Sequence, residues 1–167
     1  EIDCLSVEAT NSRIDFKTKR QSHFSILRDL IVSIFSHLKE TPINAIGINH
    51  LCHYSLRNST EYINFGYWLS PVEQLGSLLN RPKLQTIQFV ETKDNDNINN
   101  EGVIRLTISP SDLILDQKSV VLNSNHHFQN PKGTDAKEMI SLMINKWDFS
   151  FEKVNNLNNL IWEKAKY

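Results

Sequence analysis

Cysteine and glycine are scarce in this chain of 167 residues, and it has no long apolar run. Its two cysteines, Cys4 and Cys52, are too few for a disulfide framework and indicate free thiols in a reducing compartment. Five glycines leave little material for phosphate-binding loops, and neither a dinucleotide fingerprint nor a nucleophile elbow occurs. No apolar run approaches the roughly 20 residues of a membrane helix, and no signal segment opens the chain. We therefore expect a cytoplasmic protein that does not contact membranes.

The chain also lacks an excess of positive or negative charge, because its formal net charge is −1. This balance gives no electrostatic reason to expect nucleic acid as a partner, since such proteins normally carry a basic face. One local cluster is basic, formed by Lys17, Lys19 and Arg20 with Arg13 nearby. It lies next to Asp15 and is expected to be a solvated turn. A nucleic-acid binder of low affinity that uses these side chains stays as a third alternative.

What the sequence does contain is typical of a globular domain. Hydrophobic residues make up 40% of the chain and charged residues 22%, so it can bury a core of its own. We find no internal repeat and no linker rich in proline, glycine or serine. The chain is therefore predicted to be a single domain over residues 1–167.

Hydrophobic periodicity predicts the order of the elements along the chain. Alternating apolar and polar residues indicate strands, and apolar residues at three- and four-residue steps indicate helices. The predicted strands are 4–9, 14–17, 43–56, 84–92, 102–109 and 119–128; the predicted helices are 22–39, two short ones within 59–79, and a long one from 135 to the end. The last helix is either continuous or broken near residues 148–150.

This order predicts an α+β fold, in which a curved antiparallel sheet of about five to six strands has helices packed on one face and a long helix at the C-terminus. The order resembles that of helix-grip and TATA-binding-protein-like folds. A helix of ~30 residues is about 45 Å long, which is more than ordinary strands cover. Part of the last helix is therefore expected to project or to meet a partner.

Histidines are the strongest chemical signal in the sequence. His50 lies on a predicted strand with Cys52, and His126 and His127 lie near the end of another. Residues three apart in a strand point to opposite faces, so His50 and His53 cannot hold one metal ion without a bulge. A site built from His50, Cys52 and His126 would also need a carboxylate that no spacing specifies. No metal or other cofactor is therefore predicted, and hydrogen-bonding roles are expected for these side chains.

Aromatic side chains gather on the last predicted helix. Trp147, Phe149, Phe151 and Trp162 occupy more than a third of its circumference, so some of them should stay exposed in a monomer. Exposed aromatics of this kind mark an association surface. We predict a partner-binding surface at Trp147, Phe151 and Trp162.

Scattered motifs occur across most of the chain. They include a Gly-Ile-Asn strand motif and an Asn-x-His-aromatic strand motif, and the residues concerned are Gly47–Asn49, Tyr54, Phe65, Gly66, Leu69, Pro71, Gly102, Ser109–Ser111, Asn125, His127 and Phe128. With these residues the chain resembles an uncharacterised family of bacterial intracellular proteins. The sequence departs from the family after Pro71, because Val72 to Leu75 stand where members continue to a tryptophan. The resemblance implies no established activity and no catalytic residue.

The resemblance singles out Asn49, Asn125 and His127, and with His50 and His126 they form a candidate polar site. Each of these side chains can also satisfy backbone groups at a strand end.

Three functions follow as hypotheses. The first is a non-catalytic binding or assembly protein that self-associates, or docks a protein partner, through its C-terminal helix. The second is a metal-dependent hydrolase or small-ligand-binding domain that uses the strand histidines His50, His126 and His127 with Cys52. The third is the nucleic-acid binder described above. Whether the protein is an enzyme stays open at this point.

Overall fold

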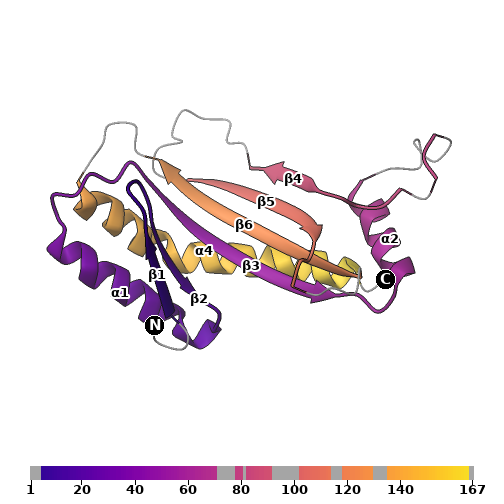
Figure 1. Ribbon diagram of the computed structural model, residues 1–167, viewed down its shortest axis with the longest axis horizontal. Helices are drawn as coiled ribbons and strands as arrows, with labels where there is room; N and C mark the ends of the chain where they lie inside the picture. The colour runs from indigo at the N-terminus through magenta and orange to yellow at the C-terminus, as the bar shows by residue number, and fades with distance from the viewer. Residues whose placement is uncertain are drawn as a thin grey trace. The chain divides into compact units, whose positions relative to one another are not determined.

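The computed structural model describes residues 5–70, 78–80, 82–91, 102–113, 118–129 and 135–165. Within these ranges the strands are β1 (Leu5–Ala9), β2 (Ile14–Thr18), β3 (Ala45–Ser55), β4 (Ile87–Val90), β5 (Val103–Pro110) and β6 (Ser119–Gln129). The helices are α1 (Phe24–His37), α2 (Ser59–Leu69) and α4 (Ala136–Ala165), with a short 3-10 turn at Gln21–His23. The fold is α+β, as predicted, and it ends in a long C-terminal helix (Figure 1).

The described strands form two antiparallel sheets, whereas the sequence predicted one sheet. β3, β6, β5 and β4 form a four-stranded sheet in that order, and among the described strands β1 pairs with β2 alone. The alternation of apolar residues identified the hairpin correctly. Alternation does not encode which strand edge a hairpin joins, so the sheet count could not follow from it.

The predictions of the helices that became α1, α2 and α4 agree with the structure to within a few residues, whereas residues 78 and 79, predicted to be helical, form a turn. α4 is continuous over 30 residues and has no break at residues 148–150. The Asn58 side chain accepts a hydrogen bond from the Glu61 backbone N–H at 2.9 Å, which caps the N-terminus of α2. Of the second short helix predicted within 59–79, residues 71–77 lie outside the described part of the chain.

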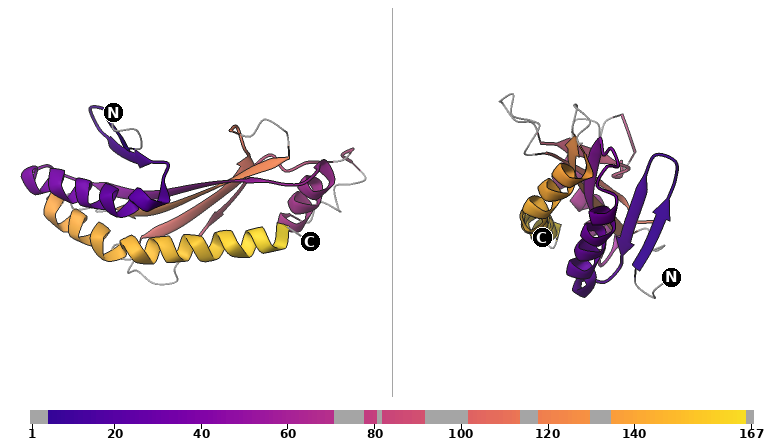
Figure 2. Two further views of the ribbon diagram at one scale, coloured as in Figure 1. Left: turned by 90° about the horizontal axis from the view of Figure 1, so that it is seen from below. Right: turned by 90° about the vertical axis from the view of Figure 1, so that its left-hand side faces the viewer.

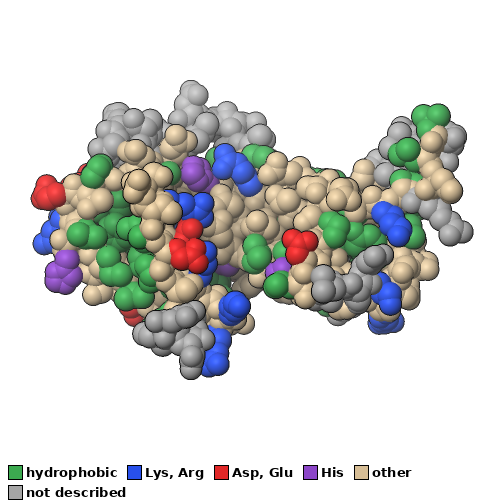
Figure 3. All heavy atoms as spheres, viewed as in Figure 1, with side chains coloured by type: hydrophobic (Ala, Val, Ile, Leu, Met, Phe, Trp, Pro, Cys, Tyr) green, Lys and Arg blue, Asp and Glu red, His purple; other side chains and the backbone are tan. Residues whose placement is uncertain are grey.

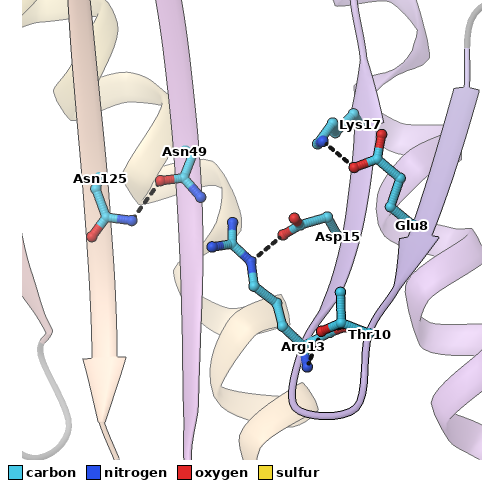
Figure 4. A network of polar contacts seen from close by, with 7 residues as sticks. All are labelled: Glu8, Thr10, Arg13, Asp15, Lys17, Asn49 and Asn125. Atoms are coloured by element: carbon cyan, nitrogen blue, oxygen red, sulfur yellow. Dashed lines mark hydrogen bonds and ion pairs between the residues drawn. The ribbon is translucent and has the colours of Figure 1, made fainter.

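Residues 1–44 and 130–146 form one of two compact units. In this unit the β1–β2 hairpin is held by ion pairs between Lys17 and Glu8 and between Arg13 and Asp15, both at 2.7 Å (Figure 4). Phe16 of β2 contacts Phe35 of α1 with ring centroids 6.4 Å apart. Two of the basic side chains that suggested a nucleic-acid partner, Lys17 and Arg13, are therefore paired with carboxylates.

The second unit comprises residues 45–129 and 147–167, and contains the four-stranded sheet. The C-terminal part of α4 runs along one face of this sheet (Figure 2). Buried side chains of the sheet, α2 and α4 form one hydrophobic core, made up of Leu56, Tyr62, Phe65, Leu106, Ile108, Val120, Leu122 and Ile161. Tyr62 also donates a hydrogen bond to the Leu84 carbonyl at 2.8 Å, which ties α2 to the segment before β4.

Candidate functional site

The four-stranded sheet sorts the predicted polar residues onto two faces. Because side chains alternate along a strand, His50 of β3 and His126 of β6 lie on the face that packs against α4, which we call the inner face. Asn49, Asn125 and His127 lie on the opposite, outer face. The candidate polar site therefore consists of two groups of residues on opposite sides of one sheet.

His50 packs against α4 through an aromatic contact. Its ring lies edge to face with Phe151, with centroids 4.4 Å apart and planes at 90°. Its Nε2 atom is buried and has no hydrogen-bond partner in the described structure. Burial and, secondly, the nearby His126 lower the pKa of His50 from 6.5 to about 4. His50 is therefore neutral at physiological pH.

His126 is more deeply buried, with 1% of its surface exposed. Its ring lies 4.2 Å from that of Phe128 and 6.1 Å from that of Phe149 on α4. Gly102, just before β5, approaches it so closely that an added Cβ would lie 2.8 Å from Nε2. Gly102 also has a φ of +70°, which favours glycine, so the backbone here is shaped to leave room for the imidazole.

Further polar groups share this interface between sheet and helix. Ser124 lies opposite His50 in the β3–β6 register and is 1% exposed, while Ser150 of α4 is 0% exposed. The hydroxyl oxygens of both serines are buried without a hydrogen-bond partner among the described atoms. We call His50, Ser124, His126 and Ser150 the polar layer. The two serine hydroxyl groups reduce stability, because most polar atoms in a protein interior are paired.

Cys52 lies two residues beyond His50 on the inner face and receives a hydrogen bond from Asn158 of α4. The amide nitrogen lies 3.0 Å from the sulfur atom. Burial raises the pKa of the Cys52 thiol, so it stays protonated at neutral pH. A protonated, half-buried thiol is a poor nucleophile and a poor metal ligand.

A metal centre lacks support in the described part of the chain. No group of three or more His, Cys, Asp or Glu side chains there lies close enough to hold an ion. His50, Cys52 and His126 share the inner face but do not form such a group. His127 points to the outer face, where burial and then Arg105 lower its pKa.

On the outer face, the Asn125 side-chain Nδ2 donates a hydrogen bond to the Asn49 side-chain Oδ1 across the β3–β6 pair at 2.5 Å (Figure 4). Gly47 makes this contact possible, because a Cβ there would lie 2.9 Å from the Asn125 amide nitrogen. The Gly-Ile-Asn motif and the Asn-x-His-aromatic motif therefore meet at this pair. The arrangement fixes the two side chains and provides no acid, base or nucleophile.

One polar pair was not found from the sequence. His53 Nδ1 lies 2.7 Å from the Ser111 hydroxyl oxygen on the outer side of the sheet. Ser111 is only 7% exposed, and no hydrogen bond of the His53 Nε2 atom to an orienting carboxylate is recorded in the described structure. A serine and a histidine alone, with the hydroxyl buried, do not make a nucleophilic site. No local motif links residues 58 positions apart, so only the strand pairing brings them together.

The aromatic side chains predicted to bind a partner lie on the sheet side of α4. Trp147 is 7% exposed and contacts Phe151, and Trp162 stacks on Tyr54 with ring centroids 4.7 Å apart. Phe149 and Leu160 are the large apolar side chains of this part of α4 that are exposed, at 49% and 55%. The partner-binding role of Trp147, Phe151 and Trp162 stays a prediction, and in this structure their rings are engaged within the chain.

β3 is an edge strand of the described sheet, because it pairs with β6 on one side alone. Leu56 N–H donates to the Lys118 carbonyl at 2.7 Å, which continues the β3–β6 register. Backbone groups alternate in direction along an antiparallel strand, so the even-numbered residues of β3 bond to β6. The N–H and C=O groups of the odd-numbered residues, from Ala45 to Ser55, therefore point away from the sheet. No described strand pairs with them.

Comparison with family models, curated proteins and solved structures finds no match for this chain. Among the described residues, no helix combines the length and the apolar character needed to cross a membrane. Acidic, basic and hydrophobic side chains are interspersed on the face shown in Figure 3.

Proposed function

We propose that the protein is a non-catalytic assembly protein and that its copies associate edge to edge through β3. The observation that carries the proposal is the outward-pointing backbone of this strand. β3 has 11 residues, so its edge is roughly 36 Å long. Two such edges can satisfy each other's N–H and C=O groups, as neighbouring strands do within a sheet.

The side chains of β3 favour pairing, because the usual protections of an edge strand are missing from it. Natural edges carry lysine, proline or a bulge that prevents strand addition. β3 contains neither a charged residue nor a proline, and its register with β6 is regular from end to end. With no charge on the edge, two identical strands meet without repulsion.

A second copy is therefore the partner that fits this edge. An antiparallel pair of identical strands has two-fold symmetry, which is the commonest symmetry of protein dimers. Leu51 lies near the middle of β3 and is 58% exposed. A two-fold axis at this residue would bury Leu51 of each copy against the other and place Asn49 opposite His53. The two four-stranded sheets would join into one continuous sheet.

We include in this proposal a helix-grip or TATA-binding-protein-like arrangement of the elements. The long helix α4 that packs along the sheet supports it. The inner face of the present sheet is covered by α4, so association through β3 leaves the core unchanged. The exposed Phe149 and Leu160 on α4 are the alternative surface, in keeping with association through the C-terminal helix.

Two matched variants distinguish the strand edge from the helix. Leu51→Lys places a charge at the centre of the β3 edge, where two copies would bring like charges together. Leu160→Lys makes the same change on α4 at a residue of similar exposure. The oligomeric state of each is measured by light scattering after size exclusion and by native mass spectrometry.

We expect a dimer for the wild type and for Leu160→Lys, and a monomer for Leu51→Lys. A dimer that only Leu160→Lys disrupts would move the interface to α4. A wild type that is monomeric at every concentration would refute self-association by either surface.

A further inference from the structure

His50 occupies an unusual position for a histidine, because the described residues of β6 and α4 packed around it give its ring no charged partner. Phe151 of α4 covers the ring with centroids 4.4 Å apart, and the buried Nε2 atom has no hydrogen-bond partner in the described structure. Ser124 lies directly opposite it on β6. A neutral imidazole fits this position, and a charged one would need water or an acceptor at Nε2.

The titratable neighbours of His50 do not supply a negative charge. On the inner face these are His126 of β6 and Cys52 of β3, and the protonated Cys52 thiol is neutral. A charged His50 would also be opposed by any positive charge on His126, and this effect is the second cause, after burial, that keeps His50 neutral.

The element packed over His50 offers no compensating carboxylate either. Asp148 and Glu152, the acidic residues of α4 on either side of Phe151, are both exposed. Lys153 is paired with Glu91 at 2.5 Å, so that carboxylate is already engaged. Within the described residues, the contact between α4 and the sheet is therefore built for a neutral His50.

We propose that the polar layer is an acid-sensitive contact, in which uptake of a proton by His50 releases residues 147–165 of α4 from the inner face of the sheet. The proton comes from solvent and binds at Nε2, and no other bond is made or broken. The charged ring is solvated only when the helix moves away, so the open state binds the proton more tightly than the closed state. Mildly acidic conditions therefore shift the population toward the open state.

The proposal is independent of association through β3, because it concerns the inner face. Opening would separate Phe151 from His50 and Trp162 from Tyr54, both of which are ring contacts between α4 and β3. The aromatic residues on the sheet side of α4 would then face solvent. An aromatic surface that is covered at neutral pH would become accessible in acid.

Hydrogen exchange read by mass spectrometry tests this directly on the whole chain. Peptides covering residues 147–165 are compared at about pH 7.5 and about pH 5, after correction for the intrinsic effect of pH on amide exchange. From the preference of His50 for the neutral form, we expect the opening constant of this segment to rise on the order of ten-fold in acid. The β5–β6 peptides should keep most of their protection.

Three variants accompany the wild type. His50→Leu and His50→Asn both remove the titrating group, one with an apolar and one with a polar side chain, so a folding defect in one leaves the other to interpret. His37→Gln removes an exposed histidine of α1 and serves as the control. We expect the acid effect on residues 147–165 to disappear in both His50 variants and to persist in His37→Gln. Equal protection of the wild-type segment at both pH values, or an unchanged acid effect without His50, would overturn the proposal.

Discussion

The burial of His50 predicts how the stability of the sheet–helix unit depends on pH. Folded His50 takes up its proton near pH 4, whereas the unfolded side chain does so near pH 6.5. Between these values the unfolded state holds more protons, so acidification favours unfolding. The contribution of neutral His50 to stability is therefore fully present above pH 6.5 and is lost as the pH falls toward 4.

The size of the effect follows from the same two values. Uptake of one proton over this interval lowers the free energy of unfolding by at most about 3 kcal/mol, because each pH unit contributes about 1.4 kcal/mol. The ring of His50 is only half-buried, so water screens part of the charge in the folded state. We therefore expect the free energy of unfolding of the wild type to fall by about 1–2 kcal/mol more than that of His50→Leu over the same interval.

Urea unfolding followed by tryptophan fluorescence measures this difference. Trp147 and Trp162 lie in the affected part of α4, and their signals report its detachment from the sheet. The free energy of unfolding is determined at several pH values from about 7.5 to about 4 for the wild type, His50→Leu and His37→Gln. Parallel curves for wild type and His50→Leu would refute the reasoning, because the pH dependence would then arise from other groups.

Three further predictions address single positions. Gly102→Ala should lower the free energy of unfolding by at least about 1–2 kcal/mol, because φ is +70° and the new Cβ would contact Phe128; urea unfolding measures it. Asn158→Leu should change the free energy of unfolding by no more than about 1 kcal/mol in either direction, because it removes both the hydrogen bond to Cys52 and a buried Oδ1 that has no partner among the described atoms, whereas Asn158→Asp should destabilise strongly in the same assay. Leu51→Pro should abolish dimers yet leave most of the fold intact in circular dichroism, whereas Cys52→Pro should unfold the sheet because its N–H bonds to β6.

The sequence was sufficient to predict most elements of the fold, because their signals are local. Periodicity located the strands and helices to within a few residues, and Asn58 with Glu61 marked the start of α2 as a capping pair. Strand alternation also predicted that His50 and His53 lie on opposite faces. The α+β class and the long final helix followed from the order of these elements.

The pairing of distant strands was beyond the reach of a single sequence. The register β3–β6 brings Asn49 to Asn125, and β3 with the end of β5 brings His53 to Ser111, but no spacing along the chain encodes either pair. For the same reason, the sequence did not predict that the β1–β2 hairpin forms a sheet of its own. Register depends on burial of a whole face and on turn geometry, which are properties of the assembled sheet.

The side of α4 that faces the sheet could have been predicted from the sequence. Trp147, Phe151, Val154 and Ile161 recur at three-, four- and seven-residue steps and face the sheet, whereas Phe149 lies off this stripe and is 49% exposed. Treating all the aromatics as one surface obscured the difference. The narrow stripe predicts the packed side, and the residues beside it are the ones left for solvent or a partner.

Amide exchange resolved by residue tests the central claim, pairing through the β3 edge, most directly. The even-numbered amides of β3 are protected by β6 in any state, whereas the odd-numbered amides of Asn49, Leu51 and His53 are protected only when the edge is paired. We predict that these three amides are protected at high protein concentration and lose protection on dilution. Free exchange at every concentration, or protection that does not change on dilution because a segment of the same chain covers the edge, would contradict the account.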